Sequence, residues 1–194
     1  FDILSRLGSG GYGQVDKIVS KVSFRQYALK RIRRRTAFGN NSKEAMKSFM
    51  SEIQIVKSLK HRHVIRYIGS YTDKTYLGLV MSSIDRLHDQ ALAAEMRSTL
   101  RTYFGCLAAA LTYLHDSLIR HKDIKPQNIL VDKGNVLLTD FGLSRDFADD
   151  VGSTTSGITP ASPRYSPPEV AAYEARNTSA DVWSLGCVFF EMVA

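Results

Sequence analysis

Cysteine is scarce in this sequence of 194 residues, and long apolar runs are absent. Only Cys106 and Cys187 occur, far apart and each inside an apolar stretch. This pattern speaks against a disulfide framework or a cysteine metal site, and it predicts two buried structural thiols in a reducing compartment. No apolar run approaches the ~18 residues of a membrane span, and no segment resembles a signal peptide. We therefore expect no membrane segment and an intracellular location, cytoplasmic or nuclear.

The composition is that of an ordinary globular protein, with 44% hydrophobic and 23% charged residues. The net charge of +7 is uneven, because residues 1–81 hold 16 Lys and Arg against 5 Asp and Glu, whereas residues 82–194 hold 10 against 14. The basic part, with its run Arg31–Arg35, suits a nucleic acid, a phosphate-handling enzyme or simply a solvated face. The asymmetry indicates two lobes of different character and identifies no ligand.

Short strands and one helix are predicted for the first part of the chain. Apolar or alternating runs predict the strands Phe1–Leu7, Gln14–Ser20, Gln26–Ile32, Val64–Tyr71 and Tyr76–Met81. Between them, Lys43–Lys60 is predicted to be a helix, because apolar side chains recur every three or four residues at Met46, Phe49, Met50, Ile53, Val56 and Leu59. Residues up to Met81 should therefore form a small β-rich unit.

The second part of the chain is predicted to be mostly helical. One buried helix face is predicted from Leu100, Tyr103, Phe104, Leu107, Leu111 and Leu114. A further helix fits Ala180–Ala194, and two short strands fit Ile129–Val131 and Val136–Leu138. The predicted fold class is α+β, divided near Ser82.

Three glycines, Gly8, Gly10 and Gly13, lie between the first two predicted strands. Glycines allow a backbone to approach phosphates closely and to offer its amides, although a glycine-rich hairpin is also a common structural device. No Lys-Ser/Thr pair follows and no helix begins there, so the motif is neither a Walker loop nor a dinucleotide-binding fingerprint.

Lys30 shares one face of its predicted strand with Ala28, since strand side chains alternate. A small apolar side chain beside a cation is what an adenine and its phosphates require. Glu52 is the expected partner of Lys30, because it lies within the apolar pattern of the helix, where an unpaired carboxylate would be costly. A helix-surface glutamate is the alternative.

The segment His121–Asn128, HKDIKPQN, followed by Asp140-Phe141-Gly142, carries the strongest chemical signal. Asn128 and Asp140 offer hard oxygen ligands that suit Mg²⁺ bridging phosphates, and Asp123 can orient a hydroxyl nucleophile. With GSGGYG, YALK, SPPE and DVWSLG, these make six motifs in order. Together they resemble the catalytic domain of eukaryotic-type protein kinases of the serine/threonine class.

The resemblance implies a two-lobed protein-kinase-like fold over residues 1–194, with a small antiparallel β-rich N-lobe holding one helix (1–81), a hinge (82–85) and a mostly helical C-lobe (86–194). It implies ATP and Mg²⁺ as cofactors and protein substrates with serine or threonine acceptors, and no nucleic acid. The implied catalytic residues are Asp123, Lys125, Lys30 and Glu52, and the implied metal ligands are Asn128 and Asp140. The implied ATP-binding residues are Leu7, Gly8, Gly10, Gly13, Val15, Ala28, Lys30, Met81, Ser82, Ile84 and Leu130.

Two residues bear on the acceptor. Lys125, two residues after Asp123, and Ser162, seven residues before Glu169, both match the serine/threonine class of the family. Lys122 stands where the family has an arginine that often binds an activation-segment phosphate, and lysine lacks the bidentate fork. Whether phosphorylation regulates the chain is therefore open, and the available acceptors are Ser153, Thr154, Thr155, Ser156 and Thr159. Pro167 replaces the family's usual alanine.

The resembling fold continues beyond the helix that contains Asp181, so we expect the chain to be a C-terminally truncated piece with an incomplete C-lobe. In that fold a late arginine pairs with the residue equivalent to Glu169. A pseudokinase or interaction module with little or no phosphotransfer is the main alternative function, and a small-molecule phosphotransferase is a more distant one. The oligomeric state is left open.

Overall fold

The computed structural model describes residues 1–10, 13–33, 42–82, 85–86, 96–132, 134–146, 162–172 and 177–193. The chain divides into two compact units. The first comprises Phe1–Lys60 and Ile65–Ile84, and the second comprises His61–Val64 and Asp85–Ala194. Within these ranges no helix is both long and apolar enough to cross a membrane.

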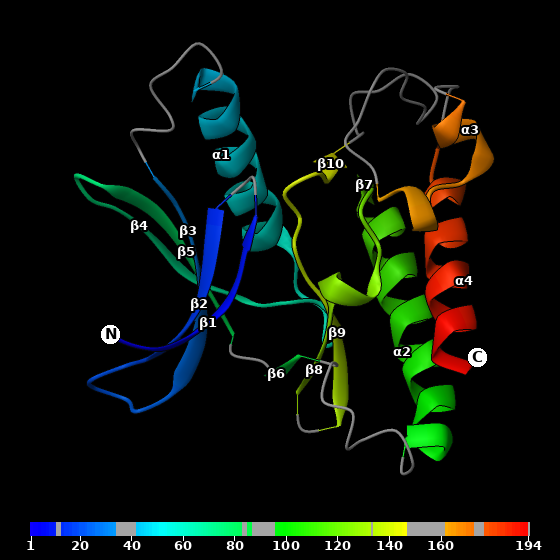
Figure 1. Cartoon of the computed structure of the whole chain (residues 1–194), viewed down its shortest axis with the longest axis horizontal. Coiled ribbons are helices and arrows are strands. Elements are labelled where there is room, and N and C mark those ends of the chain that lie inside the picture. The colour runs from blue at the N-terminus through cyan, green and yellow to red at the C-terminus, as the bar shows by residue number, and fades with distance from the viewer. Residues whose placement is uncertain are drawn as a thin grey trace. The chain divides into compact units, whose positions relative to one another are not determined.

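A five-stranded antiparallel sheet forms the first unit, in the order β1-β2-β3-β5-β4 (Figure 1). Its strands are β1 (Asp2–Gly10), β2 (Gly13–Val19), β3 (Gln26–Arg33), β4 (Tyr67–Thr72) and β5 (Tyr76–Ser82). Ile18, Leu29 and Val80, one from each of three neighbouring strands, make a buried cluster on one face. Apolar burial across neighbouring strands thus holds the sheet together.

The helix of the first unit is α1 (Ser42–Ser58), and its buried face differs from the predicted one. Phe49 and Val56 are buried as predicted, but Met50 is 47% exposed. The buried face also includes Glu52 and Ile55. The apolar pattern therefore predicts this face correctly at Phe49 and Val56 and wrongly at Met50.

The strand predicted over Val64–Tyr71 begins only at Tyr67. Val64 instead forms an isolated parallel bridge with Leu138, and the Leu138 N–H donates to the His63 carbonyl at 2.9 Å. The His61 ring also stacks on Tyr113, with centroids 4.9 Å apart. The prediction failed here because an apolar run does not show which part of the chain it will pair with.

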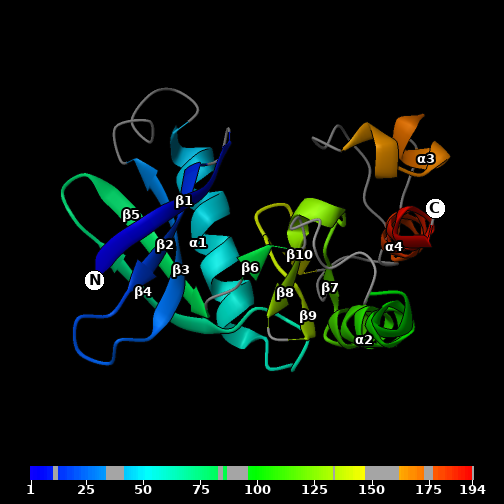
Figure 2. The same cartoon turned by 60° about the horizontal axis from the view of Figure 1, so that its bottom comes forward.

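Two long helices, α2 (Met96–Asp116) and α4 (Ser179–Val193), lie side by side in the second unit (Figures 1 and 2). The rings of Phe104 and Phe189 meet between them, with centroids 4.3 Å apart. The predicted buried face of α2 is confirmed at Tyr103, Leu107, Leu111 and Leu114. Leu100 belongs to α2, but its side chain lies outside the described part of the structure.

Short strands and turns complete the second unit. A three-stranded sheet has the order β6-β8-β9, from β6 (Asp85–Arg86), β8 (Ile129–Asp132) and β9 (Asn135–Leu138). A two-stranded pair joins β7 (Ile119–Arg120) to β10 (Arg145–Asp146). The remaining elements are the 3-10 turns Pro126–Asn128 and Pro163–Tyr165 and the short helix α3 (Pro168–Ala171). Residues 121–128 therefore connect β7 to β8.

The two cysteines, predicted to be buried, are free thiols that are only partly buried. Cys106 and Cys187 each precede a fully buried residue, Leu107 and Val188 respectively. One residue turns an α-helix by about 100°, so each thiol lies at the margin of its helix's buried face.

Candidate catalytic site

Lys30 and Glu52 form a buried ion pair in the first unit. The Lys30 Nζ lies 2.7 Å from Glu52 Oε1 and 2.9 Å from Oε2, and the two side chains are 8% and 3% exposed. Removing two charges from water is costly, and contact with both carboxylate oxygens offsets that cost. The pairing predicted from the sequence is confirmed. It fixes a cation on the central strand β3.

The glycine-rich segment forms the end of the β1–β2 hairpin, where Gly10 pairs with Gly13. Gly13 has φ +129°, and a Cβ there would lie 2.4 Å from the Arg31 carbonyl oxygen. Only glycine fits such a close approach of two backbones. Of the other predicted ATP-binding residues, Leu7 and Val15 on the same hairpin are partly buried.

Ala28 and Met81 are buried partners across the β3–β5 pair. The Ser82 N–H donates to the Arg66 carbonyl at 2.9 Å, so it is not available to a ligand. Leu130 lies on β8 in the second unit and is partly buried. Ile84 lies outside the described residues, as do Ser153, Thr154, Thr155, Ser156 and Thr159.

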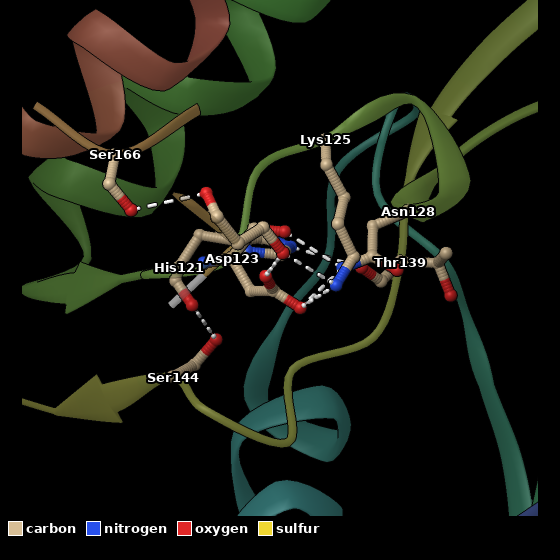
Figure 3. A network of polar contacts seen from close by, with 8 residues as sticks. His121, Asp123, Lys125, Asn128, Thr139, Ser144 and Ser166 are labelled. Carbon is tan, nitrogen blue, oxygen red and sulfur yellow. Dashed lines mark hydrogen bonds and ion pairs between the residues drawn. The ribbon is translucent and has the colours of Figure 1, made fainter. Parts of the chain in front are cut away.

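Asp123 lies at the centre of a polar cluster in the second unit (Figure 3). The Lys125 Nζ donates to its Oδ2 at 2.7 Å, and the Ser162 hydroxyl donates to its Oδ1 at 3.0 Å. Lys125 and Ser162 also contact each other, with Nζ 3.1 Å from Oγ. Ser162, whose position matched the serine/threonine class, thus contacts the loop directly. Both carboxylate oxygens are held in fixed directions.

Asn128 completes this cluster. Its Nδ2 donates to the Asp123 carbonyl at 2.8 Å and to Oδ2 at 3.0 Å, and the residue is 5% exposed. Backbone bonds hold it as well, since its N–H donates to Lys125 and its carbonyl accepts from Thr139. With Nδ2 directed at Asp123, Oδ1 is the amide atom that can accept a cation.

His121 supports the loop from inside. It is fully buried, and its Nε2 lies 3.0 Å from the Thr139 carbonyl. Because a carbonyl only accepts, Nε2 carries the proton, and Nδ1 accepts the Asp123 N–H at 3.3 Å. The Ser144 hydroxyl donates to the His121 carbonyl at 3.1 Å (Figure 3). The ring also packs near Phe141, at 4.9 Å between centroids.

Asp181, in the first turn of α4, fixes the start of the loop. Its carboxylate accepts the N–H groups of His121 and Lys122, each at 2.8 Å, and lies 3.1 Å from His115 Nε2. Burial by itself raises the pKa of Asp181, but the bond from His115, the nearby His121 and the two N–H groups hold it below its ordinary value. Lys122 has φ +67°, an uncommon conformation that these bonds stabilise.

The supporting residues were not predicted as such. Sequence reasoning noted Asp181 only as part of a motif, and it did not single out His115, Thr139 or Ser144. A signal for Asp181 was present, because a carboxylate that starts an apolar helix needs partners when it is buried. The others act through a ring nitrogen (His115), a backbone carbonyl (Thr139) or a hydroxyl (Ser144), each in a single hydrogen bond that leaves no pattern in a sequence.

Asp140 follows β9 and has φ +63°. It is partly buried, whereas Phe141 after it is 1% exposed. Positive φ is rare outside glycine and frequently marks functional positions. An Asp carboxylate and the Asn128 amide oxygen are hard donors of the kind that Mg²⁺ prefers. Chemically, the cluster can orient a hydroxyl beside a carboxylate and a cation.

Comparison with known proteins identifies the family. The family model described as "Protein kinase domain" matches residues 1–194. The chain is 33% identical to Mitogen-activated protein kinase kinase kinase A of Dictyostelium discoideum over 96% of its length and 20% of that protein. It is 36% identical to Serine/threonine-protein kinase fused of Drosophila melanogaster, over 100% of the chain and 24% of that protein.

A third relative is Serine/threonine-protein kinase AtPK2/AtPK19 of Arabidopsis thaliana, 32% identical over 100% of the chain and 41% of that protein. The chain thus spans less than half the length of the curated relatives it matches. The similarity covers all the residues predicted to carry the chemistry.

Proposed function

We propose that this chain, which belongs to the protein kinase domain family, transfers the γ-phosphate of ATP to serine and threonine hydroxyls of protein substrates. The observation that carries the proposal is the cluster in which Lys125 and Ser162 bind the two oxygens of Asp123. Relatives named as serine/threonine kinases support the same acceptor class.

Asp123 is proposed to receive the substrate's hydroxyl proton. The substrate oxygen attacks the γ-phosphorus, the bond from that phosphorus to the β,γ-bridging oxygen breaks, and ADP leaves. Because Ser162 and Lys125 hold the carboxylate, Asp123 needs little reorganisation to meet the hydroxyl. The Lys125 ammonium, 2.7 Å from Asp123, stabilises the negative charge of the transferring group.

The family implies Mg²⁺, and the donors of the second unit fit it. The Asn128 amide has its nitrogen turned to Asp123, so its oxygen can bind a cation, and Asp140 supplies a carboxylate. When bound, Mg²⁺ would neutralise phosphate oxygens. Asn128 and Asp140 are the residues proposed to hold it.

In the first unit, Lys30 is proposed to bind the α- and β-phosphates, with Glu52 holding its ammonium in place. Gly8, Gly10 and Gly13 would cover the phosphates with backbone amides. The adenine contacts are assigned to the apolar side chains of Leu7, Val15, Ala28 and Met81, with the backbone carbonyl of Ser82 and backbone groups of Ile84. Leu130, in the second unit, is also assigned to the adenine. Residues 82–85 are proposed as the hinge.

The experiment compares wild type, Asp123→Asn and, as a matched control, Asp116→Asn, an exposed acid at the end of α2. We expect Asp123→Asn to abolish transfer of labelled phosphate to a generic protein substrate while ATP binding stays nearly unchanged. Asp116→Asn should behave as wild type. Matched losses of binding and transfer in Asp123→Asn would make Asp123 a structural residue instead.

Product analysis separates the alternatives. Phosphoserine and phosphothreonine are the expected products, and a product dominated by phosphotyrosine would contradict the roles of Lys125 and Ser162. A folded wild type that binds ATP with Mg²⁺ but transfers nothing to any protein would be a pseudokinase. The presence of Lys30, Glu52, Asp123, Asn128 and Asp140 argues against that outcome.

A further inference from the structure

The first unit contains a buried charge cluster that the proposed reaction does not use. It consists of Gln14, Asp16 and Arg31, and we refer to it as the Asp16 cluster. Side chains alternate along a strand, so Arg31 projects from the face of β3 opposite to Lys30. Asp16 is 1% exposed, and the Arg31 side chain is 16% exposed. Buried charges of this kind need a reason.

Asp16 is bound from two strands. The Arg31 guanidinium on β3 forms an ion pair with Asp16 Oδ2. From β2 itself, the Gln14 Nε2 donates to Oδ1 at 2.7 Å and to Oδ2 at 2.8 Å. Arg6 on β1 is more distant, at 3.9 Å, and is 64% exposed. The carboxylate therefore links β2 to β3, and Arg6 adds a weaker interaction from β1.

Arg31 is itself held from its other side. Its Cζ lies 4.9 Å from the centroid of the Tyr76 ring on β5, a cation–π contact. Its register partner on β5 is Gly78, whose missing Cβ leaves room for Tyr71, since a Cβ would lie 2.2 Å from that ring. The guanidinium is thus fixed by aromatic neighbours and by Asp16.

The cluster begins next to the glycine-rich end of the β1–β2 hairpin. Gln14 directly follows Gly13, and it pairs with Arg31 in the β2–β3 register and with Ser9 in the β1–β2 register. The Gly13 backbone also abuts the Arg31 carbonyl. Side chains and backbone therefore connect the glycine-rich end of this hairpin to Arg31, the residue next to Lys30.

We propose that Asp16 is a positioning residue for the nucleotide: through Gln14 and Arg31 it holds the glycine-rich hairpin in register with Lys30, so that the hairpin binds the phosphates of ATP. The proposal rests on the proposed function, because it needs the hairpin to contact a nucleotide. Asp16 itself lies on the other face of β2 from Val15, so its proposed action on the nucleotide is indirect.

The consequence is greatest for the phosphates. A loosened hairpin loses its contacts to the phosphate oxygens, whereas only part of the adenine contacts, those assigned to Leu7 and Val15, lie on the hairpin, and those assigned to Ala28 and Met81 on β3 and β5 remain. Weakening the Asp16 cluster should therefore reduce affinity for ATP more than affinity for adenosine. A general loss of folded structure would reduce both affinities.

The test measures binding of Mg²⁺-ATP and of adenosine by calorimetry to the whole chain, as wild type, Asp16→Asn and Gln14→Met. Asp2→Asn is the matched control, because Asp2 on β1 of the same sheet pairs with Lys21 at 2.9 Å but both side chains are exposed. We expect ATP affinity to fall about three- to tenfold in Asp16→Asn, a change equivalent to about 1 kcal/mol. Gln14→Met should show a smaller fall, and Asp2→Asn none.

Each outcome decides the matter. A larger loss of affinity for ATP than for adenosine supports the proposal. Unchanged ATP affinity, or equal losses for both ligands, overturns it. If Asp16→Asn does not fold, Gln14→Met decides by the same criterion, because it keeps the ion pair of Asp16 with Arg31. A folded wild type that binds adenosine and ATP equally weakly would contradict the proposed function, and not merely this inference.

Discussion

Replacing Asp181 by asparagine should destabilise the second unit strongly at neutral pH. The carboxylate accepts the N–H groups of His121 and Lys122, each at 2.8 Å, and is only 3% exposed. Asparagine offers one oxygen and turns an NH₂ group toward the second N–H. Hydrogen bonds to charged groups contribute about 1.5–3 kcal/mol each, so losing one and weakening the other should cost about 3–4 kcal/mol.

The pKa of Asp181 adds a second, pH-dependent part to this prediction. Burial opposes ionisation, but His115, His121 and the two N–H groups together hold the pKa below its ordinary value of 3.8. A folded pKa below the unfolded one stabilises the protein fully above the unfolded pKa, and this contribution is lost as the pH falls toward the folded pKa. The difference between wild type and Asp181→Asn should therefore narrow below about pH 4.

Urea denaturation followed by tryptophan fluorescence measures this effect. Trp183 is the only tryptophan in the sequence and lies on α4, so its emission reports the second unit. Asp116→Asn, an exposed acid at the end of α2, is the matched control and should leave the free energy of unfolding within about 0.5 kcal/mol of wild type. An Asp181→Asn midpoint equal to wild type at pH 7 would refute the reasoning. So would a deficit that stays constant between pH 7 and pH 3.

Three further predictions concern the candidate site and the first unit. Lys30→Met should lower the free energy of unfolding by about 3–5 kcal/mol, because Glu52 would stay buried without its cation. Adding Glu52→Leu to this variant should restore part of the lost stability, as measured by thermal melts. Gly13→Ala should lower the free energy of unfolding by about 2 kcal/mol or more, because Gly13 has a positive φ and the new Cβ would lie 2.4 Å from the Arg31 carbonyl oxygen. A variant as stable as wild type would contradict this packing. Ser162→Ala should lower kcat about tenfold or more, whereas Ser162→Thr, which keeps the hydroxyl, should retain most activity in the same transfer assay.

The elements that the sequence predicted well are those whose signal is local. In the helix face at Tyr103, Leu107, Leu111 and Leu114, apolar residues recur every three or four positions. The hairpin glycines lie within six residues, and HKDIKPQN is one continuous segment. The ion pair of Lys30 with Glu52 was predictable because a carboxylate inside an apolar helix face requires a partner.

What could not be predicted depends on partners distant in sequence. Val64 looks like the start of a strand until Leu138 is seen to pair with it. Asp16 resembles any polar strand residue, and its burial is explained only when the guanidinium of Arg31, the register partner of Gln14 on β3, is seen to pair with it. Met50 fits the helical repeat, but the buried face turns toward Glu52 because an ion pair stabilises the charge there.

The segment His61–Val64 has a consequence for modularity. It belongs to the second unit, where His63 bonds to β9 and His61 stacks on Tyr113, although the residues on both sides of it belong to the first unit. Neither unit is therefore one continuous stretch of the sequence. A cut after Ile84 separates Val64 and His63, 3% and 4% exposed here, from their partners on β9, whereas a cut after Lys60 separates β4 and β5 from the rest of their sheet. A chimaera that takes its sheet from another protein must therefore also contain four residues, in place of His61–Val64, that pack against the second unit.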